Sequence, residues 1–168
     1  MSAFVSSQFK YCPLVWMNHS RKLNNKINRI HERALRIVYN DRKSTFEDLL
    51  IKDDSVTVHV QNIRAVMVEM FKIKIGVAPE LMNDVFEQCV QSNYDLRGSS
   101  DFKSRSIKTV YYGESSLSFL GTKLWSTLPE ELLQTKSLPE FQTKIKNWVP
   151  ENCPCRLCKN YVVQVGFI

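Results

Sequence analysis

The chain has 168 residues, of which 43% are hydrophobic, so it can bury the core of a compact domain. Its net charge is +6, with 23 basic against 17 acidic side chains, which favours an anionic partner. No run of about 18 apolar residues occurs, and no basic start followed by an apolar block opens the chain. We therefore expect no membrane-spanning helix and no secretion, and a location in the nucleus or cytoplasm.

Near the start of the chain, Pro13 interrupts a short predicted helix, and residues 20–39 then give the clearest helical pattern. Ser20 is the expected N-cap. Basic residues recur at steps of four, three, four and three, which is the spacing of one helix face. This basic stripe consists of Lys22, Lys26, Arg29, Arg33 and Arg36. An apolar stripe runs one position along, through Leu23, Ile27, Ile30, Ala34 and Ile37. We expect the apolar stripe to be buried and the basic stripe beside it to be exposed.

Further helices are predicted in the rest of the chain. Ser44 and Glu47 have the spacing of a capping box before a short helix. The remaining helices are expected at 45–51, 56–75, 81–89, 116–128 and 138–148. The predicted fold is mainly α, with two small helical clusters joined by an irregular or strand-like arm, and with a cysteine-bearing C-terminal tail. The two helical clusters are expected at 1–90 and 116–150, the arm between them at 91–115, and the tail at 151–168.

The basic stripe is the strongest functional signal. Lys and Arg side chains that cover phosphates gain affinity by releasing condensed counterions. Glu32 is the only acid between positions 19 and 40, so local pairing does not neutralise the stripe. We predict contacts to an RNA or DNA backbone, with Lys108 and the adjacent Tyr111 and Tyr112 of the arm adding charge and base stacking. A solvated face, an acidic protein partner or a membrane surface are the alternatives.

The tail contains Cys153, Cys155 and Cys158. The two-residue gap between the last two lets both thiolates reach one zinc ion, and Cys153 is a third candidate ligand. The fourth ligand would be Cys89, Cys12, a histidine or a group from a second chain. Free thiols in a reducing compartment are the alternative, because five cysteines make a poor disulfide framework.

No catalytic constellation is evident in the sequence. Asp53 and Asp54 lack the flanking strands and third acid that two-metal chemistry needs, so we interpret them as loop residues. The three histidines have no local nucleophile beside them, which favours structural or surface roles. Trp16, Trp125 and Trp148 are expected in the core.

Several blocks of sequence nevertheless look familiar. They are YCPLVW at 11–16, HERALR at 31–36 with Tyr39, KTVYYG at 108–113, Gly121 with Trp125 and Leu128-Pro129, and WVPENCPCRLCK at 148–159. In this order they resemble the region that follows the polymerase core in non-LTR (LINE-type, jockey-like) retrotransposon reverse transcriptases. The resemblance extends over nearly the whole chain.

The resemblance implies a thumb-like helical region and downstream segment that hold RNA and target DNA beside an upstream polymerase domain. By position, it implies that Lys26, Arg29, Arg33 and Arg36 contact nucleic acid. The family's catalytic turn, Tyr/Phe-x-Asp-Asp, has no match here, and neither has an endonuclease domain. The chain would thus be a non-catalytic part of an RNA-directed DNA polymerase, or an inactive transposon remnant. Its tail departs from the Cys-Cys-His-Cys knuckle that some relatives carry.

Overall fold

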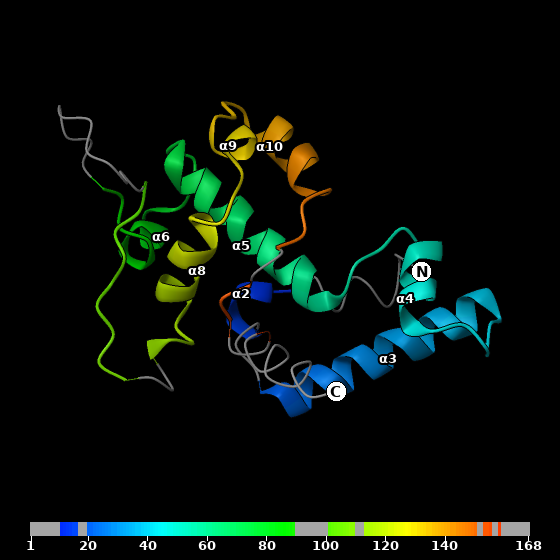
Figure 1. Cartoon of the computed structure of the whole chain (residues 1–168). Helices are drawn as coiled ribbons and strands as arrows, with labels where there is room; N and C mark the ends of the chain where they lie inside the picture. The colour runs from blue at the N-terminus through cyan, green and yellow to red at the C-terminus, as the bar shows by residue number, and fades with distance from the viewer. Residues whose placement is uncertain are drawn as a thin grey trace, which may run out of the picture. The chain divides into compact units, whose positions relative to one another are not determined.

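The computed structural model describes a mainly helical chain, which confirms the predicted fold class (Figure 1). The residues that it describes are 11–16, 20–89, 101–109, 113–150, 153–155 and 158. The chain divides into two compact units, residues 1–65 and 66–168, and the dividing line falls within helix α5 (Val58–Lys74). Among the described residues, no helix has the length and apolar character needed to cross a membrane.

The first unit contains α2 (Pro13–Trp16), α3 (Arg21–Tyr39) and α4 (Phe46–Lys52). The Ser20 hydroxyl accepts the Leu23 N–H at 3.4 Å, which confirms the predicted N-cap of α3. At the other end, Asn40 adopts a left-handed conformation and its N–H bonds back to the carbonyls of the last turn, so the helix stops there.

The predicted capping box of α4 is wrong by one residue. Thr45, not Ser44, is the N-cap, and its hydroxyl accepts the Asp48 N–H at 3.2 Å while Asp48 accepts the Thr45 N–H at 3.0 Å. Ser44 is engaged elsewhere, because its hydroxyl donates to Asp41 at 2.7 Å. An aspartate three residues after the cap serves as well as the glutamate of the usual pattern.

Helix α4 packs on a different flank of α3 from the one the apolar stripe predicted (Figure 1). The buried residues of α3 are Asn24, His31 and Leu35. Leu23, Ile30 and Ile37 remain 46%, 57% and 74% exposed, so their predicted burial is wrong. The physical reason lies in α4, whose leucines form a small core around Leu35 (Leu49 and Leu50, with Tyr39 and Phe46 against them).

The second unit is organised around the remainder of α5, from Val66 to Lys74. The buried residues of this part cover more than one side of the helix, as predicted, and are Val66, Met67, Met70, Phe71 and Ile73. The helices that follow are α6 (Glu80–Val85), α8 (Leu117–Trp125), α9 (Glu130–Leu133) and α10 (Leu138–Ile145). Helix α6 is shorter than predicted, because the chain turns extended at Phe86 and Gln88 forms an antiparallel bridge with Phe102.

Aromatic rings fill the core of this unit. Phe71 and Phe141 stack at 4.2 Å between centroids, and Phe102 meets Trp125 edge-on at 5.2 Å. Trp125 is buried, which confirms its expected core role. Gly121 lets α8 lie close against Phe86, since a Cβ at this position would lie 2.4 Å from the Phe86 ring. Residues 101–109 of the predicted arm are irregular apart from the bridge at Phe102, and 110–112 lie outside the described residues.

Candidate metal centre and nucleic-acid interface

His59 is held on the first turn of α5. The Thr57 hydroxyl accepts the Val60 N–H at 3.4 Å, which supports the start of the helix at Val58. The His59 side chain is buried. A histidine on a well-formed helical turn is a suitable metal ligand, because the backbone restricts where its ring can lie.

Two cysteines of the tail, Cys155 and Cys158, are joined by hydrogen bonds. The Cys158 N–H donates to the Cys155 carbonyl at 3.2 Å and faces the Cys155 Sγ at 3.4 Å. A backbone N–H directed at sulfur stabilises a thiolate there. The neighbouring Cys153 and Cys155 thiols, together with burial, raise the pKa of Cys158.

Ligand atoms of His59, Cys153, Cys155 and Cys158 all lie within 4.8 Å of one another. This cluster is a candidate metal centre. A tetrahedral zinc with bonds of about 2.0–2.3 Å requires ligand atoms roughly 3.8 Å apart, so each pair of ligand atoms would have to approach by no more than about 1 Å. Three sulfurs and one imidazole nitrogen are a donor set compatible with zinc.

The structure thus supplies a candidate for the fourth ligand that the sequence left open. The candidate is His59, whereas Cys12 and Cys89 are exposed and lie outside the cluster. More than ninety residues separate His59 from Cys153, and no local spacing links them. The only sequence signal was that the cysteine pattern was one ligand short.

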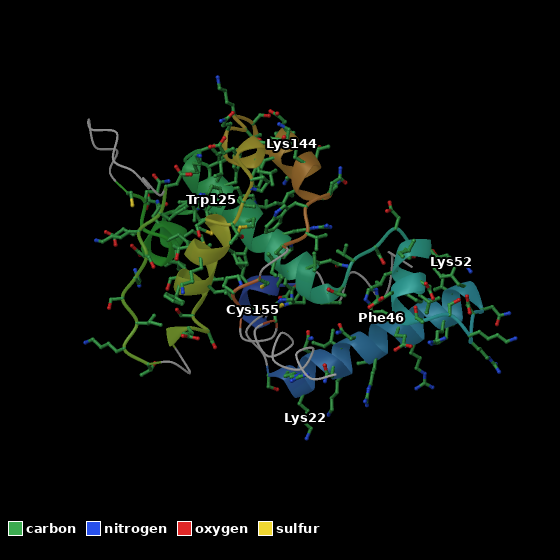
Figure 2. The ribbon with its side chains drawn as sticks, viewed as in Figure 1. Lys22, Phe46, Lys52, Trp125, Lys144 and Cys155 are labelled. Carbon is green, nitrogen blue, oxygen red and sulfur yellow. The ribbon has the colours of Figure 1, made fainter. Side chains whose placement is uncertain are left out.

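The basic stripe of α3 is exposed over most of its length. Lys22, Lys26, Arg29 and Arg33 are all exposed. Within the described part of the chain, none of the four forms an ion pair. Figure 2 shows Lys22 on the side of α3 that faces away from α4, and Phe46 at the start of α4 beside α3. From Lys22 to Arg33 the stripe extends about 17 Å along the helix axis.

Arg36 differs from the other four cations. It donates to Glu32 Oε1 from Nε and Nη2, at 3.2 and 2.7 Å, and to the carbonyls of Asp41 and Ser44 at 3.4 and 2.9 Å. These bonds connect the end of α3 to the loop before α4. The structure therefore places Arg36 in a local network and leaves four cations facing solvent.

The other predicted site residues are placed as follows. Lys108 is exposed, while Tyr111 and Tyr112 lie outside the described residues.

Asp53 and His31, for which the sequence indicated no catalytic role, make structural contacts in the first unit. Asp53 accepts a hydrogen bond from the Tyr39 hydroxyl at 2.8 Å, and this bond raises the pKa of Tyr39. His31 is buried edge-on against Phe46 at 5.6 Å, and burial lowers its pKa, opposed by the charge of Asp53.

Comparison with known proteins adds no assignment. No protein-family model, curated protein or solved structure matches the chain. The class that the fold and sites define is accordingly a helical protein with a candidate His-Cys metal centre and an exposed basic helix.

Proposed function

We propose that the chain is a non-catalytic nucleic-acid-binding protein whose α3 holds the phosphate backbone. The observation that carries this proposal is the row of four exposed cations on one face of α3, which has no ion-pair partner in the described residues. The row is continuous over about three turns of helix, which suits a polyanion better than a single small anion.

The mechanism is electrostatic. Each Lys or Arg that approaches a phosphate releases condensed counterions, and the arginines can add bidentate hydrogen bonds. Contacts of this kind position a backbone without reading its sequence, so we propose affinity for RNA and DNA with little base preference. Lys108, which is exposed, would add a further phosphate contact.

For the metal centre we propose a structural zinc ion held by His59 and the three cysteines. Four protein ligands complete a tetrahedral shell and leave no position for a substrate, which is the arrangement of a structural site. Bound zinc would supply a cross-link between His59 and the three cysteines.

The sequence resemblance supports a more specific proposal. We propose that the chain corresponds to the C-terminal region of a non-LTR retrotransposon reverse transcriptase, which works beside an upstream polymerase domain. Only the ordered sequence blocks support this origin. A primer-extension assay on the isolated chain should give no product, and any product would contradict the non-catalytic role.

The nucleic-acid proposal is tested by comparing two fourfold variants with the same loss of charge. The first replaces Lys22, Lys26, Arg29 and Arg33 by Gln. The control replaces four exposed cations elsewhere: Arg42, Lys43, Lys136 and Lys146. In a binding titration with labelled single-stranded RNA at fixed salt, the first variant should lose at least tenfold in affinity and the control only a few-fold. Equal losses would show that general charge, and not α3, is responsible.

A further inference from the structure

The exposed apolar residues of α3 have a pattern that nucleic-acid binding does not require. Leu23, Ile30 and Ile37 recur every seven residues and remain about half exposed or more. Ile27 and Ala34, which are half-buried, lie between them and complete a spacing of four, three, four and three. This is the spacing of the core positions of a coiled coil, and it extends for about 21 Å of helix axis. We call these five residues the α3 seam.

The α3 seam is a narrow strip rather than a wide apolar face. Residues seven apart on an α-helix drift by only about 20°, so its three most exposed residues lie almost in line along the axis. A lipid surface favours a wide apolar sector, commonly with aromatic residues, whereas a second helix fits a line of branched aliphatic side chains. Exposed apolar surface of this regularity is typical of an interaction site.

The two flanks of the seam restrict the partner. On one flank, α4 already covers His31, whose ring meets Phe46 at 5.6 Å. On the other flank lie the exposed cations Lys26 and Arg33, at positions that face the flank of a docked helix. A second copy of the chain fits poorly, because an antiparallel pair would set these cations against each other and a parallel pair would need the flank that α4 occupies.

We propose that the α3 seam docks an amphipathic helix of another protein that carries acidic residues along one flank. The apolar side of that helix would cover Leu23, Ile30 and Ile37, and its carboxylates would meet Lys26 and Arg33. Charge complementarity at such flanking positions selects the partner and its orientation.

The test uses the full chain and two synthetic amphipathic peptides with identical Leu/Ile heptads, one with Glu and one with Lys at the flanking positions. The acidic peptide should bind at least tenfold more tightly. The triple variant with Leu23, Ile30 and Ile37 changed to Gln should lose this binding by at least tenfold while keeping its affinity for RNA, since the cations remain. Charge reversal by K26E and R33E should shift the preference toward the basic peptide.

Several outcomes would overturn the proposal. They are equal affinity for the two peptides, unchanged binding by the triple variant, seam-dependent binding to anionic phosphatidylserine vesicles that exceeds binding to the acidic peptide, and a seam-dependent dimer in sedimentation. Circular dichroism of the triple variant should match that of the wild type, because the three replaced side chains are exposed. A proposal that failed here would leave the RNA result intact, since the triple variant alters only Leu23, Ile30 and Ile37 and keeps the four exposed cations of α3.

Discussion

Arg36 and Glu32 form an ion pair at 2.7 Å one turn apart on α3, and neither side chain is fully exposed. The basic residues of α3 therefore fall into two groups with different roles. Arg36 stabilises the junction between α3 and α4 through Glu32 and two loop carbonyls, whereas the four cations before it face solvent.

The first prediction follows from this separation. Arg36→Gln should lower the free energy of unfolding by about 1–2 kcal/mol, because charged hydrogen bonds to Glu32 and to the backbone are lost. The matched variant Arg33→Gln should leave stability within about 0.5 kcal/mol and weaken RNA binding instead. Urea unfolding and RNA titration of both variants check this. A stability loss in Arg33→Gln equal to that in Arg36→Gln would contradict the division of roles.

The second prediction concerns metal binding. Purified chain reconstituted with zinc should hold one ion, and Cys155→Ser should lose it, because the buried Cys155 is one of the four proposed ligands. Cys89→Ser is the control, since Cys89 is exposed and lies outside the cluster. Metal analysis after dialysis, and the d–d absorption of a cobalt-substituted sample, measure the result. Identical metal content in the two variants would exclude the site.

The third prediction concerns the contact between α8 and Phe86. Gly121→Ala should destabilise the second unit by about 2–3 kcal/mol, because the added methyl would overlap a buried ring. The comparison is Gly76→Ala, where a Cβ would meet nothing within 4 Å and the cost is only that of a positive φ of 74°, about 1 kcal/mol. Thermal unfolding would rank the two variants. A smaller effect at Gly121 would mean that the ring of Phe86 can move aside.

The fourth prediction is a pH dependence near α4. Hydrogen bonds from Ser44 and from the N–H of Lys43 hold the pKa of Asp41 at about 2, below the 3.8 of the free side chain. A depressed pKa means that the folded state favours the carboxylate, so its stabilisation is complete above about pH 4 and is lost as the pH falls toward 2. Unfolding midpoints between pH 5 and pH 2 should fall less steeply in Asp41→Asn. Parallel curves for that variant and the wild type would show that protonation of Asp41 does not cause the loss of stability at low pH.

Local sequence patterns predicted the helices well because caps and periodicity act over a few residues. Ser20 is the N-cap of α3, where the pattern placed it, and α3 ends at Tyr39, the last residue of the predicted range. The buried flank of α3 could not be predicted in this way, because it depends on where α4 packs. His59 could not be predicted as a candidate ligand for the same reason, because it lies far from the cysteines in the sequence and meets them only in the folded chain.

The dependence of RNA affinity on salt tests the central claim most directly, because it counts the phosphates that α3 contacts. With four contacts, log affinity should fall with log salt concentration at a slope of about −3 to −4. The variant with Lys22, Lys26, Arg29 and Arg33 changed to Gln should bring the slope near −1. A wild-type slope that the fourfold change leaves unaltered would contradict the role of α3 in holding nucleic acid.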